Sequence, residues 1–208
     1  MKTKIDIQKW ERKEVYEYFS KFKYPMGGVL ADVDVTEVYD YAQSTGRSFY
    51  MTTLYNTLKI ADDIENFRYR IENGEVYLYD NTSIGPTYLR KRNKTLAFVW
   101  FNNNSDIDSF IKEARKTENQ AEMSDGLNLG ADNMHGNLIC FSCVPWVNFT
   151  AVAEPFSPLD SSFPHIVTGK FHKSGNRIMM PVSVKMHHGF GDGYHLSLFL
   201  QKFSHINW

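Results

Sequence analysis

The sequence predicts an α/β protein, a two-layer sandwich in which a mixed, largely antiparallel sheet carries helices on one side. Three observations predict it. Amphipathic segments with helical spacing fill the first 61 residues, an apolar alternation of period two begins near residue 67, and helical segments return between and after the strands. No repeat, low-complexity tract or linker divides the 208 residues, so we expect a single domain spanning residues 1–208.

Five segments are expected to be helical. Residues 10–22 place Trp10 and four other apolar side chains on one face, and Ser48 can cap a helix over residues 49–61. Asp34 opens a helix that Gly46 ends. The remaining helices are expected over residues 105–121 and 192–204.

The strands are expected where apolar residues alternate between turn signals. The Asn73-Gly74 pair predicts a hairpin between residues 67–71 and 76–79. Further strands are expected at residues 87–89, 96–101, 138–143, 148–152, 165–172 and 178–186. The basic run 90–94 is interpreted as a solvated loop, and the Gly- and Asn-rich stretch 123–137 as a long loop.

The composition argues against several classes of protein. A formal charge of −1 gives no basic surplus for nucleic acid, and no apolar run approaches the roughly 20 residues that a membrane span needs. The N-terminus lacks the apolar stretch of a signal peptide. Two cysteines make no disulfide framework, so we expect a cytoplasmic protein. Cys140 and Cys143 are expected to be core thiols on opposite faces of a strand.

The chemistry is concentrated in the motif HHGFGDG at residues 187–193. An apolar strand ends in two histidines, which are well suited to act as a general base near neutral pH. Asp192 can cap the helix that follows and accept an ion pair. A metal site of His188, Asp192 and His195 would need all three on one helix, which the intervening glycines disfavour, so we expect no metal.

This motif resembles the superfamily of CoA-dependent acyltransferases, and six further segments are similar to the chloramphenicol acetyltransferase family. The similar segments occur in the family's order over essentially the whole chain: WERKE at 10–14, SFY at 48–50, FRYRI with VYLYD at 67–80, SCVPWVNF at 142–149, GKF at 169–171 and MPVSV at 180–184. The resemblance implies the fold of that family and transfer of an acetyl group from acetyl-CoA to a hydroxyl of chloramphenicol or a related small molecule.

The resemblance also implies catalytic roles. His188 would take the proton of the acceptor hydroxyl, whose oxygen would attack the thioester directly. Ser142 would donate a hydrogen bond to the oxyanion, which in comparable sites contributes about 3 kcal/mol. Asp192 would form a buried ion pair with Arg12 and hold the turn that carries His188.

Binding residues follow from the same resemblance. Acetyl-CoA would contact three residues: Trp146, Lys170 and Phe171. The acceptor would contact four: Tyr18, Phe19, Leu96 and Phe98. Ser48 stands where the family has a lysine that contacts a CoA phosphate, and Val167 where it has a threonine that supports the transition state. The segments at 24–28 and 96–98 also depart from the family's acceptor pocket, so the physiological acceptor stays open.

The family forms homotrimers with active sites between subunits, so the resemblance implies self-association and no nucleic-acid or membrane partner. Two alternatives remain. One is the catalytic core of a dihydrolipoamide acyltransferase, whose lipoyl domain and linkers are absent from this sequence. The other is a catalytically weak trimeric protein that binds CoA or a small molecule, which the joint presence of His188, Asp192, Arg12 and Ser142 disfavours.

Overall fold

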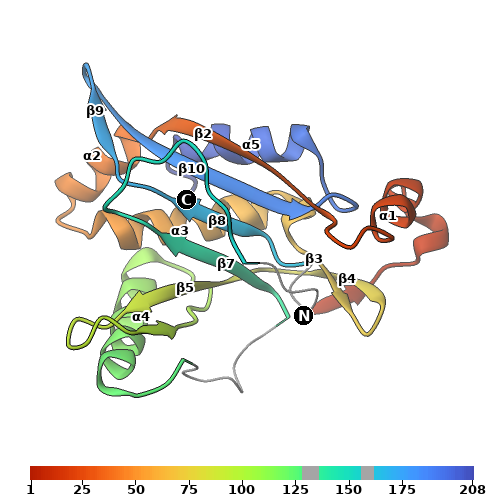
Figure 1. Cartoon of the computed structure of the whole chain (residues 1–208), viewed down its shortest axis with the longest axis horizontal. Helices are drawn as coiled ribbons and strands as arrows, with labels where there is room; N and C mark the ends of the chain where they lie inside the picture. Colours follow the sequence, from red (N-terminus) through yellow and green to blue (C-terminus); the bar gives the residue numbers. More distant parts are fainter. Residues whose placement is uncertain (128–135, 156–161) are drawn as a thin grey trace.

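The computed structural model describes residues 1–127, 136–155 and 162–208. Its main element is a seven-stranded sheet in which β2, β10, β8, β7, β5 and β6 lie in that order and β9 pairs with the start of β10 (Figure 1). The strands are β2 (Met26–Asp34), β5 (Ser83–Leu89), β6 (Leu96–Phe98), β7 (Leu138–Cys143), β8 (His165–Thr168), β9 (His172–Ser174) and β10 (Arg177–His187). Only the β5–β7 and β7–β8 pairs are parallel, which confirms a mixed, largely antiparallel sheet.

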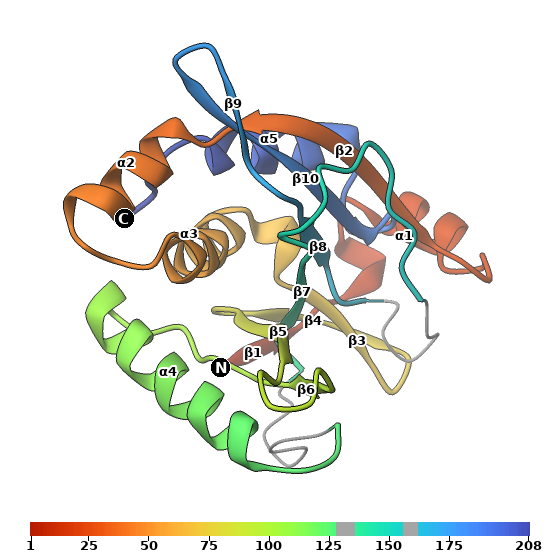
Figure 2. The same ribbon diagram turned by 60° about the vertical axis from the view of Figure 1, so that its left-hand side comes forward.

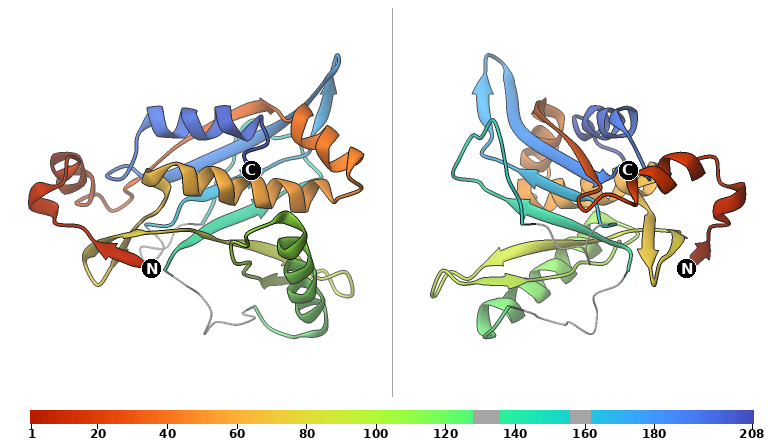
Figure 3. Two further views of the ribbon diagram at one scale, coloured as in Figure 1. Left: turned by 180° about the vertical axis from the view of Figure 1, so that it is seen from behind. Right: turned by 45° about the vertical axis from the view of Figure 1, so that its right-hand side comes forward.

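Four helices cover one face of this sheet (Figure 3, left). They are α2 (Thr36–Ser44), α3 (Phe49–Asp63), α4 (Ile107–Met123) and α5 (Gly193–Phe203). The short helix α1 (Lys13–Phe19) stands beyond the end of the sheet where β10 finishes (Figure 1). In the view of Figure 2, α3 lies between α4 and the pair formed by α2 and α5. No helix in the described ranges is long and apolar enough to cross a membrane.

The core lies between the helices and the sheet. Ser48 caps α3 as predicted, with its hydroxyl accepting from Met51 N, and ten residues of α3 are buried. On β7 the core face carries Ile139 and Phe141, because alternate residues of a strand point to opposite faces. Cys143 shares that face and packs against the core, whereas Cys140 lies on the other face.

A second, three-stranded sheet contains the predicted hairpin. Its strands are β1 (Lys2–Lys4), β3 (Tyr69–Glu72) and β4 (Glu75–Tyr79), in the order β1-β4-β3. Asn73 and Gly74 have φ angles of 52° and 80°, which are the left-handed values that a tight hairpin turn requires. This sheet holds the N-terminal segment in place beside the turn between α3 and β3.

Several individual elements differ from the expectations. The helix expected over 10–22 begins only at Lys13, because Trp10 is extended and packs its ring 4.9 Å from that of Tyr69. Residues 148–152 form no strand, and the Asn148 side chain instead contacts His172 Nδ1 at 3.0 Å. Strand β2 was not expected, because Gly27 and Gly28 weaken its pattern, yet it pairs along most of β10.

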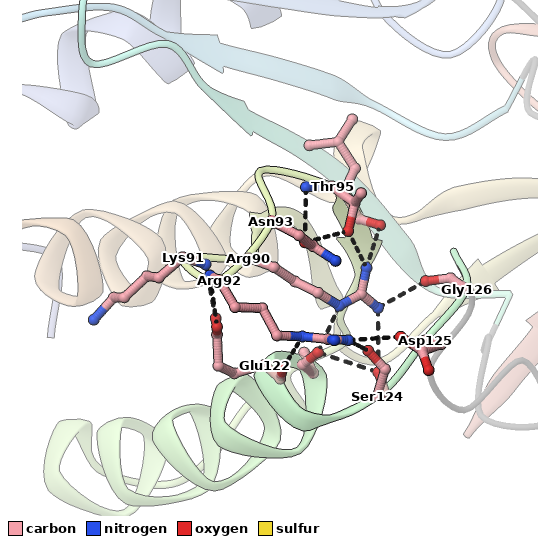
Figure 4. Close-up of polar contacts among 11 residues, drawn as sticks. Arg90, Lys91, Arg92, Asn93, Thr95, Glu122, Ser124, Asp125 and Gly126 are labelled. Atoms are coloured by element: carbon pink, nitrogen blue, oxygen red, sulfur yellow. Dashed lines mark hydrogen bonds and ion pairs between the residues drawn. The ribbon is translucent and has the colours of Figure 1, made fainter.

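The basic run 90–94 is not simply a solvated loop, because Arg90 is only 1% exposed. Its guanidinium donates to the carbonyls of Leu96, Ala121 and Gly126 at 2.7–2.9 Å and to two hydroxyl oxygens (Figure 4). Arg90 therefore ties the β5–β6 hairpin to the C-terminal end of α4. Residues 128–135 of the expected loop 123–137 lie outside the described residues.

Replacing Arg90 with methionine is expected to lower the free energy of unfolding by about 3 kcal/mol, because three buried carbonyls lose their donor. Lys91→Met is the matched control, since the Lys91 side chain is exposed and only its backbone N–H is bonded, to Glu122. Urea unfolding at pH 7 measures both. Equal stabilities of the two variants would contradict the structural role of Arg90.

Candidate active site

His188 lies in the turn that follows β10. Its backbone N–H donates to Pro25 O at 2.8 Å, so the turn is bonded to the segment that leads into β2. The imidazole stacks on the ring of Phe19, with centroids 4.0 Å apart and planes inclined by 8°. Tyr18 packs against Phe19 edge to face at 5.1 Å and is 60% exposed. Helix α1 thus brings the two predicted acceptor-binding aromatic residues to the predicted base.

The other side of the imidazole faces the backbone of β2. A Cβ placed on Gly27 would lie 2.9 Å from His188 Cδ2, closer than real Cβ atoms approach. The ring is therefore confined between Phe19 and Gly27. Its Nδ1 is buried and has no hydrogen-bond partner among the residues that the structure describes.

Gly27→Ala is expected to displace the His188 ring and to lower kcat about 10- to 100-fold while the protein stays folded. Gly193→Ala is the matched control, because nothing lies within 4 Å of the Cβ that it adds. Steady-state acetyl-transfer assays and circular dichroism measure both variants. An unchanged kcat in Gly27→Ala would show that the ring position does not matter.

Arg12 and Asp192 hold the turn from two sides. Arg12 Nε donates to Gly189 O at 3.1 Å, and Nη1 lies 3.4 Å from Asp192 Oδ2. Asp192 caps α5 by accepting from Tyr194 N at 3.1 Å. Burial acts to raise the pKa of Asp192, but Tyr194 N–H, His195 and Arg12 outweigh it and lower that pKa. The expected burial of the pair is wrong for the isolated chain, because the Asp192 side chain is 42% exposed.

His187 is a buried structural neighbour of His188. Its ring lies between Tyr16 and Phe190, and Nδ1 accepts from Gly189 N at 3.0 Å. Burial and, to a smaller extent, His188 lower the pKa of His187 to about 4. Because the fold keeps this ring neutral, His187 can serve as a fixed acceptor within the turn.

His187 is expected to make folding sensitive to acid. Its pKa is about 4 in the fold and 6.5 in the unfolded chain, so between these values only the unfolded chain binds the proton. The stability is therefore present above pH 6.5 and decreases by about 3 kcal/mol as the pH falls to 4. His187→Asn keeps an acceptor for Gly189 N and does not titrate. Urea unfolding at pH 4.5 and 7 should show a smaller loss in this variant, and an equal loss would contradict the assignment.

The alternative metal site is not formed. His188 lies in the turn before α5 begins at Gly193, so it does not share a helical face with His195, whose Nδ1 lies 3.1 Å from Asp192 Oδ1. Over residues 1–127, 136–155 and 162–208, no group of three His, Cys, Asp or Glu side chains is arranged to hold a metal ion.

Ser142 belongs to a second cluster, on the face of the sheet that the helices leave uncovered. It lies on β7 and lines a pocket of about 420 Å³ together with Phe98 of β6. Leu96 lies on the same face of β6 but outside the pocket lining, and it is 47% exposed. Val167, the register partner of Ser142 on β8, is buried.

The residues expected to bind CoA gather where the parallel strands β7 and β8 end. Lys170 N donates to Val147 O at 2.9 Å, which places Lys170 next to the segment that carries Trp146. The Lys170 side chain is exposed, and Trp146 is 67% exposed. Phe171 packs against the rings of Tyr39 and Phe49, both at 5.5 Å. A charged group and two accessible aromatic rings are thus available to a ligand here.

The register separates His188 from Ser142 within one chain. Ser142 pairs with Val167, and Val167 with Ser183, five residues before His188 on β10. At about 3.3 Å per residue and 4.8 Å per strand, His188 lies about 16 Å along the sheet and two strands across from Ser142. An oxyanion donor must lie about 3 Å from the reacting oxygen, so His188 and Ser142 of one chain lie too far apart to act on the same carbonyl group.

Most residues of this pocket were not predicted from the sequence. Trp100, Glu154 and His165 line the pocket beside Ser142. Cys140 lines it too, so the expectation that both cysteines are core thiols is wrong for Cys140, which lies on the uncovered face. A glutamate among apolar residues at 151–156 and a histidine opening a strand were the available signals.

Comparisons with known proteins agree with this geometry. A model of the family "Chloramphenicol acetyltransferase" matches residues 1–204. The chloramphenicol acetyltransferase of Proteus mirabilis is 26% identical over 199 residues, which cover 95% of this chain and 91% of that protein. Chloramphenicol acetyltransferase 3 of Escherichia coli is 24% identical over 98% of this chain and 96% of its own length.

Solved structures share the fold. A chloramphenicol acetyltransferase structure superimposes with a TM-score of 0.88 and 34% identity, covering 98% of both chains. A dihydrolipoamide acetyltransferase of Azotobacter vinelandii has a TM-score of 0.70 at 16% identity over 92% of this chain and 84% of its own, a likeness of fold alone. Since the family match extends over nearly the whole sequence, this chain belongs to the chloramphenicol acetyltransferase family.

Proposed function

We propose that this protein, acting as one domain over residues 1–208, transfers an acetyl group from acetyl-CoA to a hydroxyl of chloramphenicol or a related small molecule. The observation that carries the proposal is the confined His188 imidazole, stacked on Phe19 and set in a turn that Arg12 fixes. A general base must be held in one orientation to contribute fully.

His188 is the general base. Because Nδ1 is buried, Nε2 is the nitrogen that accepts the proton of the acceptor hydroxyl. The hydroxyl oxygen forms a bond to the thioester carbonyl carbon, and collapse of the resulting adduct breaks the carbon–sulfur bond. The leaving thiolate of CoA takes up the proton that His188 holds, so the imidazole returns to its neutral form.

Ser142 is the oxyanion donor. Its hydroxyl lies on the uncovered face of the sheet at the pocket, where an acceptor and a thioester can meet. Val167 stands where the family has a threonine, so it supplies no hydroxyl. Its side chain on β8 is buried. Ser142 therefore acts without a second hydroxyl from that position.

Arg12 and Asp192 are positioning residues. Arg12 bonds both the Gly189 carbonyl and Asp192, and Asp192 caps α5, so the turn is fixed at its middle and at its end. Neither takes part in proton transfer. Lys170 would pair with a phosphate of CoA, and Phe171 and Trp146 would contact its apolar parts.

The active form is a homotrimer in which His188 of one subunit meets Ser142 of the next. The support is the register, which sets these residues about 16 Å apart along the sheet in a single chain. A cyclic assembly repeats the same contact at every interface, so one pairing of the two clusters completes every site.

The test is formation of free CoA from acetyl-CoA by the purified protein, measured by chromatography because dihydrolipoamide itself carries thiols, with chloramphenicol, with dihydrolipoamide and without an acceptor. Chloramphenicol-dependent release that is lost in Ser142→Ala supports the proposal. Release with dihydrolipoamide alone would assign the protein to the alternative acyltransferase activity. Binding of CoA without acetyl transfer to any hydroxyl acceptor would identify a binding protein instead.

A further inference from the structure

Cys140 is a free cysteine in the pocket beside Ser142. It lies two residues before Ser142 on β7, so both side chains point to the uncovered face of the sheet, about 7 Å apart. The residue is partly exposed, and the pocket of about 420 Å³ gives a small molecule access to the sulfur. Cys143, by contrast, packs against the core. Of the two thiols, Cys140 is therefore the one placed to react.

His165 lies directly beside this thiol. It is the register partner of Cys140 on the parallel strand β8, and it lines the same pocket. Neighbouring strands lie about 4.8 Å apart, and the imidazole and the thiol contact each other. The Nε2 atom of His165 is buried and makes no hydrogen bond to any of the described residues. A ring nitrogen that is free and next to a thiol can take up the thiol proton.

Glu154 fixes the orientation of this imidazole. Its Oε2 lies 3.2 Å from His165 Nδ1 and its Oε1 lies 2.8 Å from Lys185 Nζ, with all three side chains less than 20% exposed. A carboxylate at Nδ1 holds the ring proton there, which leaves Nε2 as the acceptor. Burial acts to lower the pKa of His165, but contacts with Cys140 and Glu154 outweigh it and raise that pKa to about 10. The pocket therefore contains a nucleophile, a base and the carboxylate that orients the base.

We propose that Cys140 accepts an acetyl group from a thioester, with His165 as its base and Glu154 as a positioning residue, in a step that needs no hydroxyl acceptor. The sulfur forms a bond to the thioester carbonyl carbon while its proton passes to His165 Nε2. Collapse of the adduct breaks the carbon–sulfur bond of the thioester, and the leaving thiolate takes up that proton. S-Acetyl-Cys140 is itself a thioester, so a free thiol reverses the step. The inference rests on the proposed function for the thioester and for Ser142 at the oxyanion, but not for His188.

One chain contains every group of this step. Cys140 and Ser142 share β7, His165 lies on the adjacent strand, and Glu154 contacts His165 from the loop between β7 and β8. His188 of the same chain lies elsewhere, because His165 pairs with Lys185, three residues before it on β10. That register sets His188 about 10 Å along the sheet and two strands across from Cys140. Acetylation of Cys140 is therefore expected in a protein without His188.

The test uses the His188→Ala protein, incubated without any hydroxyl acceptor. One sample receives acetyl-CoA, and the other receives S-acetyl-N-acetylcysteamine, a small thioester that does not depend on the residues proposed to bind CoA. Peptide mass spectrometry after an acid quench locates the acetyl groups, and hydroxylamine removes those held as thioesters. We expect acetyl on Cys140 at a rate about tenfold or more above that of Cys143, whose pKa is raised by burial. Addition of free CoA should remove it.

Two variants assign the roles of the neighbours. His165→Gln should slow acetylation of Cys140 about 100-fold. Glu154→Gln should slow it less and should move the pH of half-maximal acetylation upward, because a ring without its carboxylate draws the thiol proton less readily. His172→Gln is the matched control, since His172 is also paired with a carboxylate, Asp32, but lies outside the pocket. Acetylation of Cys140 no faster than in the urea-unfolded chain, or unchanged in His165→Gln, would overturn the inference.

Turnover separates this inference from the proposed function. Acetylation of Cys140 in the unmodified protein, with no acetyl transfer to any hydroxyl acceptor, would support the inference and overturn the proposed reaction. Acetyl transfer to chloramphenicol, with no acetylation of Cys140 by either thioester, would support the proposed reaction and overturn the inference.

Discussion

His188→Ala is expected to lower kcat for acetyl transfer by about 10³- to 10⁴-fold, the contribution of a well-placed general base. The base has no substitute nearby, since His187 is buried and its pKa is about 4. Stopped-flow or steady-state detection of CoA thiol measures the loss. The stability of the variant should change little, because the His188 side chain is only partly buried and its Nδ1 bonds to none of the described residues.

Two measurements make this result specific. The Kd for CoA should be unchanged, because Lys170 and Phe171 lie at the other end of the sheet from His188. Phe19→Leu should lower kcat by a smaller factor, since it removes the stacked ring that orients the base but keeps the base itself. If His188→Ala kept full acceptor-dependent turnover, the assignment of the base would be wrong.

Mixing two inactive variants is expected to restore activity. In the proposed homotrimer, His188→Ala and Ser142→Ala each remove one half of a shared site, so in mixed trimers an intact His188 can face an intact Ser142. With random 1:1 assembly, the probability at each interface is one half times one half, so about a quarter of the sites should be complete. Co-refolding from urea followed by an activity assay measures the recovery.

A second mixture checks the arithmetic. In a 1:1 mixture of wild type with the double variant His188→Ala/Ser142→Ala, about a quarter of all sites in the mixture should be complete if each site joins two subunits. About half of all sites should be complete if each site lies within one chain. No recovery in the first mixture together with half retention in the second would place both residues in one subunit's site.

Local signals in the sequence predicted the elements that local chemistry determines. Ser48 caps α3 and Asn73-Gly74 turns the β3–β4 hairpin because a hydroxyl acceptor and left-handed φ angles are properties of those residues themselves. Strand β2 was missed because its pairing with β10 is a long-range property. The helix at 10–22 was predicted too long because Trp10 gains more from packing against Tyr69 than from helical continuation.

The residues of the site also divide into those that local signals predict and those that only long-range contacts bring together. The motif at 187–193 showed where a base would be, because a strand end, a turn and a capped helix can be recognised locally. The ion-paired cluster of Glu154, His165 and Lys185 could not be predicted, since these residues come from a loop and two strands that meet only in the folded sheet. The separation of His188 from Ser142 likewise depends on strand order.

The contact of Arg12 with Asp192 joins positions 180 residues apart, close to the two ends of the chain. Helix α1 buries none of its side chains completely, whereas β1 is paired with β4, so we expect α1 to loosen before β1 leaves the three-stranded sheet. Activity would then disappear before the fold does under mild denaturing conditions.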